Sequence, residues 1–370
     1  ALVAAVVVMG AAVGRLTGAG PAGVLPEEAE VPVSAEIGFS PAPPSALKPL
    51  AEGWRLVRKA PIASRHGALS TWTGERLLIW GGMSNGRKLD DGAAYDPDTD
   101  HWRLLPPAPL SGHVGLTSVW TGREWIIWGS HIHGAVPGEG VAYDPDTGAW
   151  RRLPPAPLRS SSAQAVWTGR EMLLWGGAGG AAGAAYAPDT DRWRRIARGG
   201  PDDVAAPPIW TGGEMVVMGF VGSAAYDPET DRWRPLPLPP VTPWITRNVV
   251  WTGNELLAVG GTTEAGPAAD AAAYDPAANR WRRLASAPDP IDVSDATATW
   301  TGRLLVMARG PSRLQIYDPA RDVWSETPGL LDGPRVGSVA VWTGKEMVFW
   351  GGYGVLGTPA VLEEGVAWRP

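Results

Sequence analysis

Few residues of this sequence could carry out covalent or metal chemistry. The chain has no cysteine, which excludes disulfides, thiolate nucleophiles, cysteine-ligated zinc and iron–sulfur clusters. His131 and His133 lie two residues apart, with Glu139 nearby. A loop with two histidines and no third local ligand is weak support for a metal site. We therefore expect no cofactor and no metal ion.

A second group of chemically suggestive residues is the aspartate series Asp96, Asp98 and Asp100. Carboxylates at alternate positions resemble the start of a calcium-binding loop, but the glycine and distal glutamate of such a loop do not follow. The same spacing recurs at 227–231, again followed at once by Arg-Trp. The pattern favours a β-turn that connects two strands.

An arginine follows most of the tryptophans that come after these turns. This position is occupied by Arg103, Arg151, Arg194, Arg234 and Arg282. We expect these side chains to be solvated on an outer strand.

The elements that position all these residues are repeats. Trp-Thr-Gly begins at 72, 120, 167, 210, 251, 300 and 342, so that neighbouring copies lie 41 to 49 residues apart. A Tyr-Asp-Pro segment or a variant of it follows each of the first six copies, and Trp-Arg-Pro ends the last. Each unit contains four short apolar runs between turn signals, and no run has a helical period. Units of this length with four strands predict the blades of a β-propeller.

The two ends of the repeat region complement each other. The last unit stops at Pro370 before a fourth strand, whereas the segment around Trp54 matches the fourth strand of a complete unit. We predict an all-β, seven-bladed propeller of four antiparallel strands per blade over 51–370, with its ring closed by the N-terminal strand. The repeated tryptophans are expected to pack between blades rather than to bind sugars.

The repeats resemble those of the kelch family of β-propellers over roughly 51–370. The family's glycine pair after the second strand appears as Gly81-Gly82, Gly176-Gly177, Gly260-Gly261 and Gly351-Gly352. Kelch-like copper oxidases use a cofactor in which a tyrosine is joined to a cysteine. This chain has no cysteine, so it cannot form that cofactor. The resemblance implies a binding or interaction module of bacterial kelch-repeat type, and we expect no catalytic residue. The alternative is a carbohydrate-active enzyme similar to kelch-type sialic acid mutarotases or epimerases.

The candidate binding site lies where the innermost strands begin. Aligning the units on Trp-Thr-Gly places Arg65, His113, Trp244 and Arg335 at one equivalent position, on the face with the most variable loops. Together with His66, these residues are the predicted ligand-binding set. Guanidinium and imidazole groups around a channel mouth suit an acidic ligand, which we expect to be a protein or a carbohydrate.

Charge and the N-terminal residues predict the setting of the protein. The formal net charge is −6, and no long basic run is present, so nucleic acid is not an expected partner. Residues 1–14 are uncharged and apolar, as in a signal peptide or a truncated membrane anchor, and 15–50 form a linker rich in Pro, Ala and Gly. We expect a secreted or membrane-anchored extracytoplasmic monomer.

Overall fold

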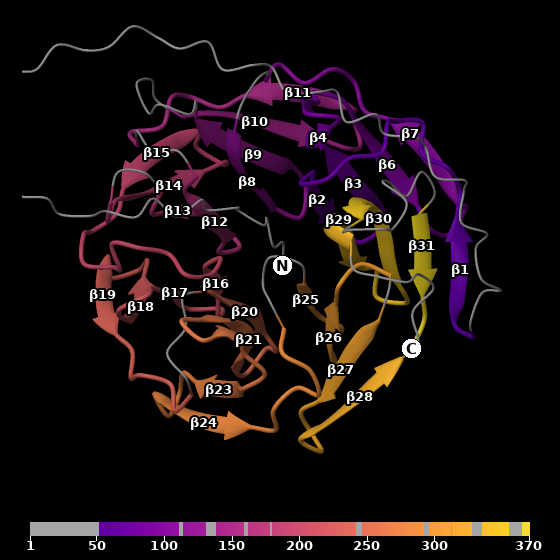
Figure 1. Ribbon diagram of the computed structural model, residues 1–370. Coiled ribbons are helices and arrows are strands. Elements are labelled where there is room, and N and C mark those ends of the chain that lie inside the picture. The colour runs from indigo at the N-terminus through magenta and orange to yellow at the C-terminus, as the bar shows by residue number, and fades with distance from the viewer. Residues whose placement is uncertain are drawn as a thin grey trace, which may run out of the picture.

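The computed structural model describes residues 52–110, 114–130, 138–158, 162–177, 180–241, 246–291, 296–311, 313–327, 335–354 and 365–370. Within them, seven sheets are arranged in a ring, as Figure 1 shows along the ring axis. This all-β propeller confirms the predicted fold class. The apolar segment 1–14 and the linker 15–50 lie outside the described residues.

The first three blades follow the chain without interruption. Blade 1 contains β2 (Leu69–Trp72), β3 (Leu77–Trp80), β6 (Gly92–Asp96) and β7 (His101–Leu104). Blade 2 contains β8 (Val114–Trp120), β9 (Trp125–Ser130), β10 (Glu139–Asp144) and β11 (Ala149–Arg152). Blade 3 contains β12 (Gln164–Trp167), β13 (Met172–Trp175), β14 (Gly183–Ala187) and β15 (Arg192–Arg195).

Blades 4 to 6 have the same strand order. Blade 4 contains β16 (Ile209–Trp210), β17 (Met215–Met218), β18 (Ser223–Asp227) and β19 (Arg232–Pro235). Blade 5 contains β20 (Thr246–Trp251), β21 (Leu256–Thr263), β23 (Ala271–Asp275) and β24 (Arg280–Leu284). Blade 6 contains β25 (Thr297–Trp300), β26 (Leu305–Ala308), β27 (Leu314–Asp318) and β28 (Val323–Thr327).

Blade 7 joins the two ends of the propeller. It contains β29 (Arg335–Trp342), β30 (Met347–Gly354) and β31 (Gly365–Trp368), and its outermost strand is β1 (Trp54–Val57). β1 pairs with β31 in antiparallel register, with Trp54 opposite Trp368 and Val57 opposite Gly365. The predicted closure by the N-terminal strand is therefore present in the structure. No helix long and apolar enough to span a bilayer occurs within the described ranges.

The innermost strands contact one another around the ring axis, and the contact of β29 with β2 completes the circle. Aromatic side chains fill the spaces between the sheets. Trp128, Trp175 and Trp350 on second strands are fully buried. Trp102 on β7 packs against Tyr95, with 4.8 Å between the ring centroids. Its indole N–H donates to the carbonyl of Arg58, which follows β1 of blade 7. The tryptophans thus connect neighbouring blades, as predicted.

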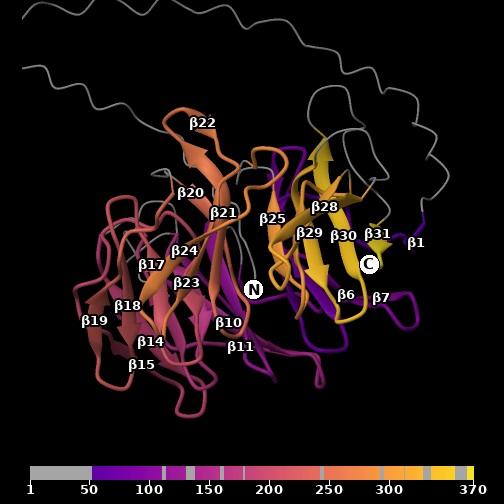
Figure 2. The ribbon, with the colours of Figure 1, turned by 90° about the horizontal axis from the view of Figure 1, so that it is seen from below.

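The connections between second and third strands form one face of the propeller, which we call the variable face. Two short strands, β4 (Met83–Ser84) and β5 (Arg87–Lys88), make a hairpin there in blade 1. In blade 5, β22 (Gly266–Pro267) pairs with the end of β21 and stands out from this face in Figure 2. Gly82 allows the sharp corner before the β4–β5 hairpin of blade 1, since its φ is +87° and a Cβ would lie 2.8 Å from the His66 carbonyl oxygen.

On the opposite face, a repeated set of polar contacts joins one blade to the next. At the junction of blades 2 and 3, Arg151 donates to both carboxylate oxygens of Glu124, at 2.9 and 2.7 Å, and to the Tyr186 hydroxyl at 3.0 Å. That hydroxyl donates to Asp191 at 2.6 Å. Burial raises the pKa of Tyr186 to about 12, so the phenol remains a donor at neutral pH. We call this arrangement the Glu–Arg–Tyr–Asp chain.

Equivalent contacts occur at further junctions. They join Glu171, Arg194, Tyr226 and Asp231; Glu214, Arg234, Tyr274 and Asn279; and Glu346, Arg55, Tyr95 and Asp100. Glu255 and Arg282 form the same ion pair in blade 5. The expectation that the arginines after the tryptophans are solvated was therefore wrong for Arg151, Arg194 and Arg234, which are only partly exposed. Arg282 is exposed as expected, although it is ion-paired. A single sequence does not show that the last residue of one hairpin lies beside an outer strand of the same blade.

Truncation tests the closure of the ring. Removing residues 1–47 should leave the melting temperature unchanged, whereas removing 1–58 should lower it strongly, because the second cut deletes β1 and leaves β31 as an unpaired edge. Thermal unfolding followed by circular dichroism measures both. Equal melting temperatures for the two truncated proteins would contradict closure by β1.

A point substitution tests the Glu–Arg–Tyr–Asp chain. Arg194→Ala should lower stability by about 1 kcal/mol, or roughly 2–4 °C in melting temperature, because the half-buried Glu171 loses its ion pair. The control is Arg195→Ala on the same strand, where the side chain is exposed. Equal losses in the two variants would show that the chain does not stabilise the junction.

Candidate functional site

Arg65, the first residue of the predicted binding set, is held within the protein. Its side chain is 0% exposed, and its guanidinium makes a 2.6 Å ion pair with Asp91 in the connection before β6. It also donates to the carbonyl oxygens of Ala63 and Gly81, at 2.8 and 3.1 Å. Asp203, at the equivalent position of blade 4, likewise accepts a hydrogen bond from the backbone of Phe220 in its own blade. These contacts brace the loops of the variable face.

His66 lies half-buried beside Arg65, at the junction of blades 7 and 1. Its ring packs edge-on against Tyr353, with 4.9 Å between the ring centroids. Desolvation lowers the pKa of the imidazole below its ordinary value, so the ring is neutral at pH 7. Tyr353 is 41% exposed and comes directly after the Gly351-Gly352 pair. Tyr353 is not among the predicted binding residues, although its place after the glycine pair puts it on the variable face.

Arg335 begins β29 and is 3% exposed. Among the described residues, no hydrogen-bond partner contacts its Nε or its Nη1. Desolvation lowers the pKa of this guanidinium. The backbone N–H of Arg335 donates to the carbonyl of Arg309 in blade 6, which fixes the start of the strand. Arg335 is thus a buried cation with free donors, in contrast to Arg65.

The beginning of β29 brings part of the predicted set together. Gly337, two residues after Arg335, accepts a hydrogen bond from the backbone of Gly67, and a Cβ on Gly337 would lie 3.1 Å from that of His66. Val336 pairs in register with Tyr353. The Arg335 side chain itself packs toward blade 6, where a Cβ on Gly310 would lie 2.7 Å from the Cβ of Arg335. We call Arg335, His66 and Tyr353, which share this end of β29, the Arg335 cluster. His113 and Trp244 lie outside the described residues, so their contribution stays a prediction.

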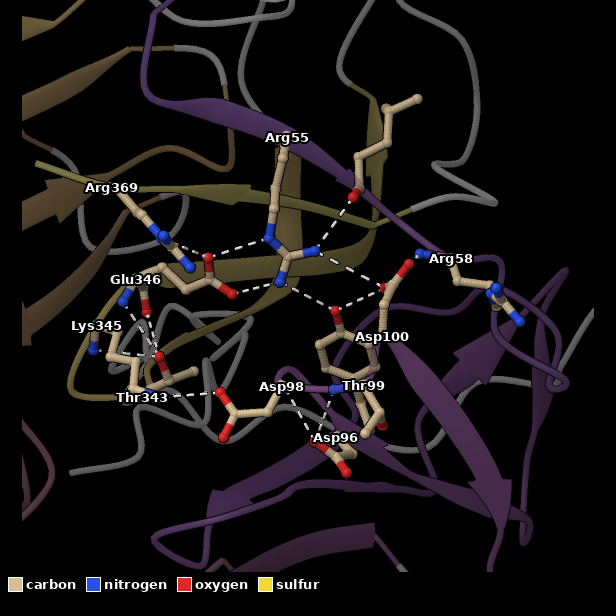
Figure 3. A network of polar contacts seen from close by, with 12 residues as sticks. Arg55, Arg58, Asp96, Asp98, Thr99, Asp100, Thr343, Lys345, Glu346 and Arg369 are labelled. Atoms are coloured by element: carbon tan, nitrogen blue, oxygen red, sulfur yellow. Dashed lines mark hydrogen bonds and ion pairs between the residues drawn. The ribbon is translucent and has the colours of Figure 1, made fainter.

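A cavity of about 280 Å³ opens on the opposite face, between the hairpins of blades 7 and 1. Trp72, Arg76, Asp96, Lys345 and Arg369 are among the residues that line it. Figure 3 shows the neighbouring contacts: Glu346 accepts from both Arg55 and Arg369, and Lys345 reaches Asp98 at 2.9 Å. Most of the charged groups around this cavity are therefore already paired within the protein.

No group of three or more histidine, aspartate or glutamate side chains suited to a metal ion occurs within the described ranges. His131 and His133 fall outside them. Asp96 Oδ1 accepts the backbone N–H groups of Asp98 and Thr99, at 3.0 and 3.3 Å, as the predicted β-turn requires.

Comparisons with known proteins agree with this architecture. A Kelch motif matches residues 64–109. No match was found among curated proteins. A solved fungal alcohol oxidase of the AA5 family, in complex with copper, is similar with a TM-score of 0.67 and 16% sequence identity, over 86% of this chain and 76% of that one. At this identity the likeness shows the fold alone. The matched motif covers blade 1 of the seven four-stranded blades, and both findings agree with the resemblance to kelch-repeat β-propellers.

Proposed function

We propose that this propeller is a binding module that recognises an acidic group of a carbohydrate or protein partner at the Arg335 cluster. The kelch propeller fold supports a binding role in general terms. The single observation that carries the finer proposal is the buried guanidinium of Arg335, whose Nε and Nη1 have no acceptor in the described part of the chain.

An ion removed from water without a partner costs several kcal/mol, and a carboxylate that accepts two guanidinium hydrogen bonds offsets that cost. The other fully buried charged side chains in the described part of the chain, Arg65 and Glu346, are both ion-paired. Arg335 differs from them in leaving donors available for a ligand.

The neighbouring rings suit the remainder of such a ligand. Tyr353 presents a partly exposed aromatic face with a hydroxyl, and His66 supplies an imidazole that can donate or accept. Aromatic rings bind the apolar face of a sugar or a partner side chain at low entropic cost. This end of β29 thus has a strong anion donor on the side of blade 6 and an amphipathic surface on the side of blade 1.

We place this binding activity outside the cytoplasm. The support is the uncharged apolar sequence of residues 1–14 and the Pro-rich stretch that follows it. Fractionation of cells that express the native gene tests this, and recovery of the protein mainly in the cytosol would contradict it.

Binding is tested with the purified propeller on a glycan array and with a panel of acidic sugars, together with an NMR assay for anomer exchange. Binding of acidic glycans without exchange supports the proposal. Catalysed exchange would contradict it in favour of an enzyme. If no sugar binds, binding of an acidic protein partner that depends on Arg335 supports the proposal with a protein as the ligand. Binding that does not depend on Arg335 would contradict it.

A pair of substitutions separates binding from bracing. Arg335→Met should weaken binding of an acidic ligand about 10- to 100-fold, as expected for losing charge-assisted hydrogen bonds, without lowering the melting temperature. Arg65→Met should lower the melting temperature instead, because it leaves the Asp91 carboxylate and three backbone carbonyl groups without their donor. Loss of stability without loss of binding in Arg335→Met would contradict its role as the ligand-binding group.

A further inference from the structure

The junction between blades 1 and 2 departs from the Glu–Arg–Tyr–Asp chain at both of its acidic positions. Where the hairpins of blades 2 to 5 end in glutamate, the hairpin of blade 1 ends in Arg76. Where the turns of most other blades have aspartate or asparagine, blade 2 has Gly148. Arginine and tyrosine remain in place as Arg103 and Tyr143.

Strand register puts these residues in the same places as their counterparts. Arg76 immediately precedes β3, as Glu124 precedes β9, and Leu77 and Trp125 both pair with the tyrosine of the third strand. Arg103 pairs with Ala94 as Arg151 pairs with Ala142. Arg76 and Arg103 therefore occupy the two positions that form a bidentate ion pair in blade 2.

Gly148 keeps the backbone conformation and loses only the carboxylate. Its φ is +70°, and the equivalent Asp191 and Asp231 have φ values of +54° and +53°. The position requires left-handed backbone, which aspartate, asparagine and glycine tolerate best. Blade 2 thus has the normal turn without the acceptor that the tyrosine hydroxyl uses elsewhere.

The result is an excess of positive charge at this junction. The chain between blades 2 and 3 carries Glu124, Arg151 and Asp191, a sum of −1, whereas Arg76 and Arg103 sum to +2. Neither guanidinium has a carboxylate within ion-pair distance among the described residues, and Arg103 donates instead to the Pro145 carbonyl at 3.3 Å. Asp96 interacts electrostatically with Arg76, but its Oδ1 accepts hydrogen bonds from its own turn.

The hydroxyl of Tyr143 lies within electrostatic range of both cations. Burial raises the pKa of its hydroxyl, and the charges of Arg103 and Arg76 both act in the opposite direction. Arg76 also lines the cavity between blades 7 and 1, so it can be reached from solvent.

From these observations we propose that the junction of blades 1 and 2 binds an oxyanion, a carboxylate or a sulfate, between Arg76 and Arg103. The anion takes the place that the glutamate carboxylate has in blades 2 to 5. Planar guanidinium groups bind such anions through paired hydrogen bonds. The site lies on the face opposite the Arg335 cluster and does not depend on the function proposed there.

The test uses the full chain and two probes, sodium sulfate and a short poly-glutamate peptide, in sodium chloride of matched ionic strength. Sulfate should raise the melting temperature of the wild-type protein above that of the chloride control. Arg76→Glu should fold, melt higher than wild type without sulfate because the new carboxylate pairs with Arg103, and bind either probe at least tenfold more weakly. Binding is measured by calorimetry.

The matched control is Arg170→Glu, an equal change of charge at an exposed hairpin position of blade 3. It should bind both probes as the wild-type protein does. Tighter binding of the peptide than of sulfate would assign the anion to an acidic partner segment, and the reverse to a small free anion. Absence of sulfate binding to the wild type, or equal loss of binding in Arg170→Glu, would overturn the proposal.

Discussion

The antiparallel pairing of β1 with β31 is the constraint on which the rest of the propeller depends. A ring of sheets keeps an unpaired strand edge unless its last blade is completed. Here the strand that completes it comes from the other end of the described chain. The pairing also places Arg55 beside Glu346, so the Glu–Arg–Tyr–Asp chain continues across the seam into blade 1. Closure therefore fixes the relative positions of blades 7 and 1, and with them the approach of His66 to Gly337 and Tyr353.

Repetition explains why the fold was predictable and why much of the site was not. Seven copies of one pattern give strand number, blade order and closure, since every blade must satisfy the same packing. The fate of a single polar side chain depends on its neighbours across strands and blades, which spacing along the chain does not show. Arg65 and Arg335 align in sequence, yet Arg65 pairs with Asp91, whereas Nε and Nη1 of Arg335 meet no acceptor within the described ranges. Likewise, nothing adjacent to Arg151 in the sequence identifies Glu124 as its partner.

The repeated polar contacts show which charged groups are already paired between blades and which could bind a ligand. Where glutamate, arginine, tyrosine and aspartate are all present, the charges are used between blades and little is left for a ligand. A binding function is therefore expected at a junction that lacks the acidic residues of the Glu–Arg–Tyr–Asp chain but has the same backbone conformation. Arg76 and Gly148 meet this condition, because Gly148 retains the left-handed φ of the turn and strand register at Arg76 is unchanged.

The cations available to a ligand, Arg335 on one face and Arg76 with Arg103 on the other, differ in their exposure to solvent. Arg335 is buried, so an anion that reaches it exchanges water for guanidinium donors in a medium of low dielectric constant, and its binding should depend little on salt. Arg76 is half-buried and Arg103 is exposed, so their interaction with an anion is screened and should weaken as ionic strength rises. A ligand held at Arg335 is thus selected by the shape and hydrogen bonding of its acidic group, whereas the junction of blades 1 and 2 distinguishes ligands mainly by their charge.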